Sequence, residues 1–275
     1  MSKILSYEKK DTWIHELSGV TKLLFFLLWC VVSMVSYDTR ILVVMVVLSF
    51  IIFRMSKTKW QQVGTVFKFV LFFLIMNLLF VFLFSPYQGT EIYGTKTVLF
   101  HIAGHYDMTK EQLFYEGNMI LKYMTVVPAV FMFLVTTNPS ELAASLNKIG
   151  VHYNVGYALS IALRYIPDVQ KDFAKIRNAQ AARGIEMSNK AGLLQRIKNV
   201  SAILFPLIFT SMDRIDVVSN AMELRGFGKY RKRTWYSSRP LQRNDYLVIV
   251  FIVVFTIAAF VITFWDGSRF YNPFV

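Results

Sequence analysis

The sequence predicts an all-α integral membrane protein with about five transmembrane helices and a cytoplasmic domain of long amphipathic helices between spans four and five. Apolar residues make up 55% of the 275-residue chain. The mean hydropathy of +0.44 exceeds what the core of a soluble domain of this size requires. Five segments contain no Asp, Glu, Lys or Arg, and the basic residues are concentrated in particular loops. These observations fix the class and the organisation of the chain.

Three of the uncharged segments are long enough to cross a bilayer. They contain 22, 18 and 20 residues and cover residues 69–90, 123–140 and 246–265. A helix needs ~20 residues to cross ~30 Å of hydrocarbon. We therefore expect each segment to form a transmembrane helix.

Two shorter uncharged segments precede them, at residues 23–37 and 41–53. With 15 and 13 residues, each must borrow flanking positions or let Lys22 and Arg54 reach the interface. Residues 37–40 predict a tight polar hairpin between two short spans, and a re-entrant pair is the alternative. Because no small-residue cleavage site follows, we expect the first span to remain in the mature protein.

The distribution of Lys and Arg predicts the orientation, because short cytoplasmic loops carry an excess of both. The loop between spans two and three has four basic residues and no acidic one. The loop at about 85–120 has two basic and four acidic residues, a net of −2, and is predicted to be external. Residues 138–245 carry 17 basic and 8 acidic residues, a net of +9, so they are predicted to be cytoplasmic together with the N-terminus.

The chain then divides into an N-terminal membrane domain at 1–137, a cytoplasmic domain at 138–245, and a last span with an external tail at 246–275. Residues 149–163 and 199–212 are also uncharged and form the basis of an alternative with two more spans. That alternative would export residues 164–198, which carry 8 basic and 3 acidic residues. We interpret both runs as apolar helix faces at the membrane surface or inside the cytoplasmic domain.

The cytoplasmic domain contains a repeated helix ending. Pro139 at a first helical position predicts a short helix that Gly150 stops near residue 149. Pro167 interrupts or kinks the next helix and can begin another. From there an apolar stripe predicts an amphipathic helix of about 17 residues that ends at Arg183 and Gly184. The stripe consists of Val169, Phe173 and Ile176.

A second helix, with the stripe Ile208, Met212 and Ile215, ends in the same way 42 residues later. Both endings fit Asn-Ala-x-x-x-Arg-Gly, at residues 178–184 and 220–226. A single arginine before a helix-ending glycine is usually structural. Two copies in one basic domain indicate docking points for a partner with two similar sites. An arginine tip suits a groove lined with carboxylates, because the guanidinium forms bidentate hydrogen bonds.

Other function classes find less support. Cys30 is the only cysteine, so an intramolecular disulfide or thiolate cluster is excluded. The chain has no phosphate-binding Gly-x-x-x-x-Gly-Lys-Ser/Thr loop. A membrane-embedded enzyme would need a metal site, and the only candidate is His101 and His105 with Asp107 nearby, in the external loop. The uncharged spans contain no carboxylate for an ion relay, which disfavours a stand-alone secondary transporter.

Two further groups of residues have ordinary structural explanations. His15 and His152 are isolated and are expected at a surface or an interface. The basic run at 229–233 is better explained by the positive-inside rule and anionic lipid headgroups than by nucleic-acid binding.

At the repeated endings the sequence closely resembles the transmembrane T component of energy-coupling factor transporters, the family that includes the cobalt-transport permease. The resemblance rests on Thr137-x-Pro139-x-Glu141-Leu142, on the run at 162–167 leading into 179–184, and on Leu224-Arg225-Gly226-Phe227. It implies a non-catalytic scaffold subunit in a bacterial cell membrane. In such transporters a separate membrane S component binds the vitamin or metal.

The resemblance also implies the roles of particular residues. Two coupling helices would dock on two cytoplasmic ATPase subunits, alike or different, and the two apolar stripes would pack together or against the S component. The ATPases, and not this chain, would bind ATP and Mg. The docking motifs would be Ala182-Arg183-Gly184 and Leu224-Arg225-Gly226, where the second has Leu224 in the place of Ala182.

Overall fold

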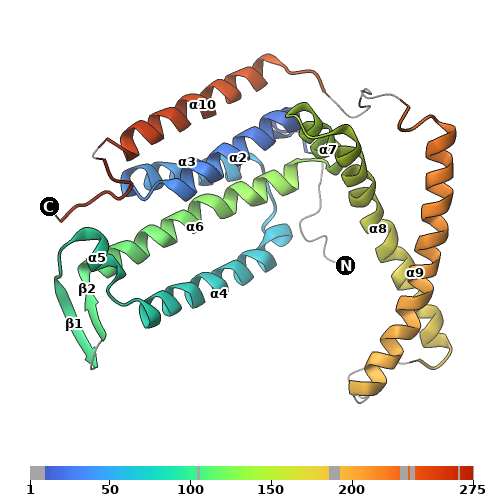
Figure 1. Cartoon of the computed structure of the whole chain (residues 1–275), viewed down its shortest axis with the longest axis horizontal. Helices are drawn as coiled ribbons and strands as arrows, with labels where there is room; N and C mark the ends of the chain where they lie inside the picture. Colours follow the sequence, from blue (N-terminus) through green and yellow to red (C-terminus); the bar gives the residue numbers. More distant parts are fainter. Residues whose placement is uncertain are drawn as a thin grey trace. The chain divides into compact units, whose positions relative to one another are not determined.

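The computed structural model describes residues 10–103, 106–185, 193–229, 235, 239–265 and 267–274. The described chain is almost entirely helical, with a single two-stranded sheet (Figure 1). It forms two compact units, which we call the membrane unit (residues 1–138 and 239–275) and the 139–238 unit. The predicted divisions at 137 and 245 concern the sides of a bilayer and stay predictions.

Three described helices are long and apolar enough to cross a bilayer: α4 (Trp60–Phe84), α6 (Lys110–Thr136) and α10 (Arg243–Thr263). They overlap the three long uncharged segments, but each helix starts and ends earlier in the chain than its segment, by up to 13 residues. The two short segments form α2 (Gly19–Val35) and α3 (Thr39–Met55), each of 17 residues. At 1.5 Å per residue each is about 26 Å long, slightly less than the hydrocarbon thickness. The count of five spans therefore stays a prediction.

The short helices begin where the sequence offers a capping side chain. Ser18 accepts a hydrogen bond from the backbone of Thr21 at the start of α2, and Asp38 accepts one from the backbone of Arg40 at the start of α3. α2 ends at Val35 and α3 begins at Thr39, so the connection has three residues. The tight connection was predicted at residues 37–40, and the last two of these belong to α3. A helix of four residues, α1 (Trp13–Glu16), precedes them.

The core of the membrane unit lies between α2, α3, α6 and α10. The Trp29 ring stacks on Phe25 and Phe255 with centroids 5.2 and 5.4 Å apart, and its Nε1 donates a 3.0 Å hydrogen bond to Ser49 Oγ. A second apolar cluster joins α4 to α6 through Val63, Val127, Phe131 and Val135. Figure 1 shows α6 between α4 on one side and α2 and α3 on the other.

The membrane unit has two distinct ends. At the anchor end, α6 finishes at Thr136 and α10 begins at Arg243. The first short segment was expected either to borrow flanking positions, as α2 does by starting at Gly19, or to let Lys22 reach the lipid interface. Lys22 lies at this end. It is instead 2% exposed and donates hydrogen bonds to the carbonyls of Thr136 and His15. His15 is 5% exposed, so of the surface or interface position expected for it, the surface position is wrong. The carbonyls at a helix end attract a cation more strongly than the distant interface does.

The opposite end, which we call the hairpin end, is more ordered than the predicted loop at 85–120. It contains α5 (Gln88–Tyr93) and the antiparallel strands β1 (Val98–Ala103) and β2 (Tyr106–Thr109). α6 starts immediately afterwards at Lys110, so its first turns replace the end of that loop. The hydroxyl of Thr109 caps α6 by accepting from the backbone of Gln112.

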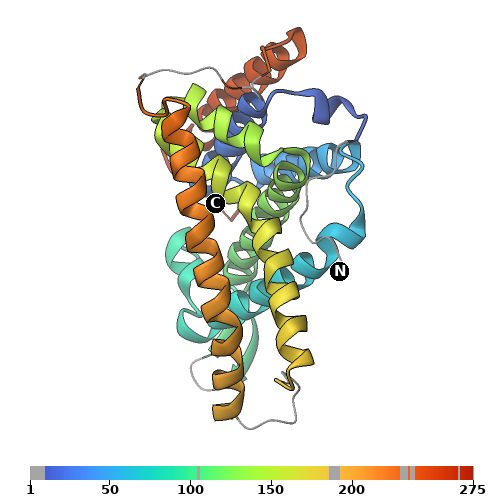
Figure 2. The same cartoon turned by 90° about the vertical axis from the view of Figure 1, so that its right-hand side faces the viewer.

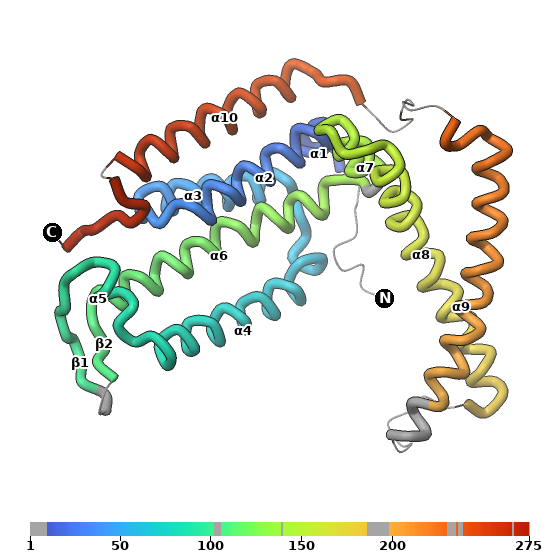
Figure 3. Tube along the Cα trace, in the orientation of Figure 1, coloured from blue at the N-terminus to red at the C-terminus, as the bar shows by residue number. Residues whose placement is uncertain are grey.

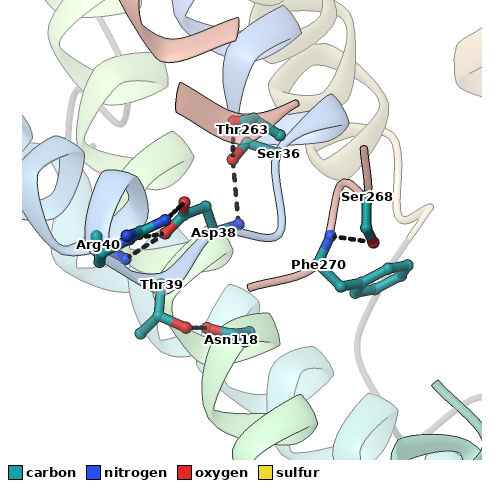
Figure 4. Close-up of polar contacts among 8 residues, drawn as sticks. All are labelled: Ser36, Asp38, Thr39, Arg40, Asn118, Thr263, Ser268 and Phe270. Atoms are coloured by element: carbon teal, nitrogen blue, oxygen red, sulfur yellow. Dashed lines mark hydrogen bonds and ion pairs between the residues drawn. The ribbon is translucent and has the colours of Figure 1, made fainter. Parts of the chain in front are cut away.

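The C-terminal residues also lie at the hairpin end. Phe270 forms a bridge with Tyr37, and Asn272 donates a hydrogen bond to the carbonyl of Tyr93. Figure 4 shows the polar contacts around the α2–α3 connection. There Thr263 Oγ1 donates to Ser36 Oγ at 2.8 Å, which ties the end of α10 to the end of α2.

The 139–238 unit contains α7 (Pro139–Lys148), α8 (Tyr153–Ala182) and α9 (Leu193–Leu224). α7 starts at the expected proline, and Gly150 behind it has a left-handed φ of 108°. Of the interruption or kink expected at Pro167, the interruption is wrong, because the 30-residue helix α8 runs through Pro167. The flanking helix turns and the packing against α9 outweigh the one hydrogen bond that proline removes. Figure 2 shows α8 and α9 as two long neighbouring helices.

Candidate functional site: two arginine-glycine helix ends

The two predicted helix endings have the same backbone geometry. Gly184 and Gly226 have left-handed φ angles of 82° and 66°. At the first ending, Gly184 N donates to Ala181 O and Ile185 N donates to Gln180 O, both at 3.0 Å. This pair of hydrogen bonds defines a Schellman ending, in which glycine takes the conformation that a Cβ disfavours.

The second ending repeats this pattern residue for residue. Gly226 N donates to Glu223 O at 2.8 Å, and Phe227 N donates to Met222 O at 2.9 Å. Arg183 and Arg225 thus occupy equivalent positions, each directly before the glycine, and both are exposed. The helix stops that the sequence predicted at Gly184 and Gly226 are therefore present.

α8 and α9 run antiparallel, which separates the two endings. Gln180 near the end of α8 donates to the carbonyl of Ala202 in the first half of α9. Phe227, just beyond α9, contacts the Tyr157 ring at the start of α8, with centroids 4.7 Å apart. Arg183 lies 26 residues beyond Tyr157, which is about 39 Å at the helical rise of 1.5 Å per residue. The two arginines therefore lie at opposite ends of the helix pair. Figure 3 shows the C-terminal ends of α8 and α9 at opposite ends of this pair.

An ion pair connects the middle of the two helices. Arg214 donates to Asp172 Oδ2 at 2.7 Å, and its guanidinium lies 5.4 Å from the centre of the Tyr165 ring. The nearby Asp172 carboxylate raises the pKa of Arg214. This contact fixes the register of the two helices. The sequence patterns of α8 and α9, taken separately, do not predict which of their residues lie side by side.

An aromatic cluster supports the second ending. Tyr153, Tyr157, Phe227 and Trp235 have neighbouring rings with centroids 4.7 to 6.3 Å apart. Trp235 Nε1 also donates to Asn147 Oδ1 of α7 at 3.1 Å. The sequence-based interpretation missed these residues. The one residue of this cluster that the sequence analysis named is Phe227, as part of the motif at 224–227.

A cleft of about 420 Å³ lies beside the second ending. Arg225 lines it together with Arg164 and Asp168 of α8, and Tyr157 and Phe227 form part of its apolar lining. The two endings therefore differ in their surroundings although their backbones match.

The two predicted apolar stripes differ in exposure. Val169, Phe173 and Ile176 of α8 are half-buried. Ile208, Met212 and Ile215 of α9 are 50%, 57% and 60% exposed. Leu224, beside the second arginine, is 90% exposed. The stripe on α9 is therefore a free apolar surface of the described 139–238 unit, because Ile203, Arg214 and Val218 supply the face of α9 that is more buried.

The alternative metal site in the predicted external loop lies only partly within the residues that the structure describes. His101 Nδ1 lies 2.5 Å from Asp107 Oδ1, and Tyr87 and Lys96 also contact this carboxylate at 3.0 and 3.2 Å. The hydrogen bond from His101 contributes most to lowering the pKa of Asp107 to about 2. His105 lies outside the described residues. Within the described residues no three His, Cys, Asp or Glu side chains group as metal ligands would.

The apolar helices define a membrane protein, and the pair of antiparallel helices with arginine-glycine endings forms its second helical unit. Comparison with known families agrees, since residues 10–236 match the family described as CbiQ, cobalt transport protein. This match covers most of the chain, so the protein belongs to that family. It is a T component of an energy-coupling factor transporter.

Relatives with curated names extend over nearly the whole chain. A protein of Leuconostoc gelidum, named energy-coupling factor transporter transmembrane protein EcfT, is 28% identical over 270 residues, which cover 93% of this chain and 94% of the relative. Proteins with the same name from Streptococcus equi and Streptococcus thermophilus are 27% and 26% identical, covering 92% and 91% of this chain and 94% of each relative.

Proposed function

We propose that this chain is the scaffold subunit of an ATP-driven importer. It would couple ATP hydrolysis by two cytoplasmic ATPase subunits to a membrane S component that binds a vitamin or a metal ion. The relatives are named as transmembrane proteins of energy-coupling factor transporters, which supports a non-catalytic role in a larger complex. The single observation that carries the proposal is the repeated Schellman ending at opposite ends of an antiparallel helix pair.

Each ending would dock on one ATPase. Arg183 and Arg225 are exposed and equivalent, so each guanidinium can enter a groove lined with carboxylates. A separation of about 39 Å, from the helical rise, is too large for one groove and suits two ATPase subunits side by side. The ATPases would bind ATP and Mg, and this chain would bind no cofactor.

The exposed stripe on α9 supports contact with a membrane partner. An apolar surface of this kind on a helix pair marks an interaction site. We infer that the S component covers it. The residues that would make the contact are Leu204, Phe205, Ile208, Phe209, Met212 and Ile215, which are 42–62% exposed. The half-buried stripe of Val169, Phe173 and Ile176 would instead hold the pair together as a rigid lever.

The orientation follows from charge. Residues 138–245 carry a net charge of +9, which favours the cytoplasm for the 139–238 unit and for the N-terminus. The hairpin end would then face outward in a bacterial cell membrane. Contact with anionic lipid headgroups would account for the basic residues before α10.

Replacement of both docking arginines tests the proposal. Loss of a charge-assisted hydrogen bond costs about 1.5–3 kcal/mol, or roughly 10- to 150-fold in affinity. The double variant Arg183→Ala and Arg225→Ala should remain in the membrane and lose the co-purifying ATPases. Arg177→Ala serves as the control, because Arg177 is an exposed arginine of α8 outside the ending.

Normal ATPase co-purification with the double variant would refute the docking sites. Transport or enzymatic activity from the purified chain alone would refute the scaffold role altogether. Activity that depends on His101 would point to the membrane-embedded enzyme instead.

A further inference from the structure

Two adjacent residues at the start of α2 contact two distant parts of the chain. Thr21 Oγ1 donates a 2.8 Å hydrogen bond to Asp245 Oδ1, at the start of α10. Lys22 Nζ donates a 3.0 Å hydrogen bond to the carbonyl of Thr136, the last residue of α6. We call Ser18, Thr21, Lys22, Thr136 and Asp245 the anchor cluster.

The charged members of the anchor cluster are buried and satisfied. Asp245 is 1% exposed and accepts hydrogen bonds at 2.8 Å from Ser18 N, Thr21 Oγ1 and Gln242 N. It lies at the N-terminal ends of both α2 and α10, where the helix dipoles favour a negative charge. Lys22 is 2% exposed and lies at the C-terminal end of α6, where the dipole favours a cation.

These contacts lie at the two junctions of the 139–238 unit. Thr136 is three residues before the unit begins, and Asp245 is seven residues after it ends. One turn of α2 therefore contacts both the segment that leads into the unit and the segment that leads out of it. Asp245 and Thr136 are 109 residues apart in sequence, and α2 contacts both of them.

We propose that the anchor cluster holds the two junctions together, so that movement of the 139–238 unit is passed to the membrane helices. This inference rests on the proposed function. Thr21, Lys22 and Asp245 are positioning residues in it, because they act through α6 and α10 and touch neither substrate nor nucleotide.

Transmission of a movement depends on the stiffness of the two junctions. A displaced unit joined by two chain segments moves its neighbours only if the segments move together. If the segments separate, the displacement is absorbed at the junctions. A buried carboxylate with three donors and a buried ammonium on a helix end resist separation, because each would leave an unpaired buried charge.

The test compares two matched substitutions in the membrane unit. Thr21→Val removes a buried hydroxyl at the anchor end. Thr263→Val removes a buried hydroxyl of the same residue type at the hairpin end, where it bonds Ser36 (Figure 4). Thr21 and Thr263 are 0% and 4% exposed, so both variants remove one hydroxyl from a similarly buried position.

The first readout is the distance between the ends of α6 and α10. Spin labels at Leu134→Cys and Leu247→Cys would report it by pulsed electron resonance in a Cys30→Ser background, because these leucines are 40% and 59% exposed. The protein would be measured as the complex with its ATPases in nanodiscs, with and without MgATP and vanadate. We expect a narrow distribution in the parent and in Thr263→Val, and a broad one in Thr21→Val.

The second readout is uptake per ATP hydrolysed in proteoliposomes, measured with the probe that wild-type vesicles accumulate among riboflavin, folate, biotin and cobalt ion. Thr21→Val should lower this ratio about tenfold, which corresponds to about 1.4 kcal/mol of lost coupling. A purely structural role predicts lower thermal stability with an unchanged distribution and ratio. That result, or equal effects of both substitutions, would overturn the inference. The proposed function fails separately, if the parent complex does not assemble with ATPases.

Discussion

A substitution at Gly184 tests whether the proposed docking of the first helix ending depends on its backbone conformation. Gly184 has φ 82°, and a Cβ placed there would meet no atom within 4 Å. Gly184→Ala therefore introduces no clash within the described chain. Its cost is the left-handed backbone, about 1–2 kcal/mol for a residue with a Cβ. Asparagine tolerates this conformation better than alanine.

If docking requires the Schellman ending, Gly184→Ala should weaken ATPase binding by roughly 5- to 30-fold, the factor that 1–2 kcal/mol represents. Gly184→Asn should recover most of this loss. The assay is titration of the purified ATPases onto the chain in nanodiscs. Gly94→Ala is the control, because Gly94 has φ 72° and equally open surroundings but lies in the membrane unit.

Two results would refute this reasoning. Equal losses for alanine and asparagine would mean that the ATPase approaches the glycine too closely for any side chain. Parent-like binding of both variants would mean that the helix ending is not part of the docking surface.

Two further predictions concern the hairpin end. The pKa of Asp107 is lowered from 3.8 to about 2, so its stabilising contacts with His101 and Lys96 are fully present above about pH 4 and are lost as the pH falls from about 4 to 2. Hydrogen exchange of the β1–β2 amides should accelerate over that interval, and an Asp107→Asn variant that kept the same acid transition would contradict this assignment. Gly89→Ala should lower thermal stability by about 1–3 kcal/mol or more, because its Cβ would meet the Glu111 backbone and lie 2.7 Å from Gln112 Cα. Gly117→Ala, in open surroundings within α6, should instead stabilise by about 0.5–1 kcal/mol, and similar melting temperatures for the two variants would show that the packing around Gly89 adapts.

Much of the fold was predictable because its signals are local in the sequence. The three long uncharged segments predicted α4, α6 and α10, since the length of a span depends only on bilayer thickness. Gly184 and Gly226 predicted two helix endings, since glycine alone enters the left-handed region without strain. Pro167 shows the limit of such reasoning, because a local propensity of this kind yields to the packing of a long helix.

The buried charges could not be predicted from their neighbours in the sequence. Lys22 beside an apolar run resembles a residue that reaches the interface, and only the end of α6 gives it a buried set of acceptors. Asp245 likewise resembles a boundary residue before the last span. Its partners Ser18 and Thr21 lie more than 220 positions earlier in the chain.

The sequence by itself determined the membrane class, the long spans and the two matched arginine-glycine endings, since each depends on residues within a few helical turns. The tertiary structure alone decided that α8 and α9 pair antiparallel, that the stripe on α9 is exposed while that on α8 is half-buried, and that Arg183 and Arg225 lie at opposite ends of the pair. The physical reason is that relative direction and burial depend on contacts between distant segments, such as Asp172 with Arg214, which the periodicity of one helix does not encode.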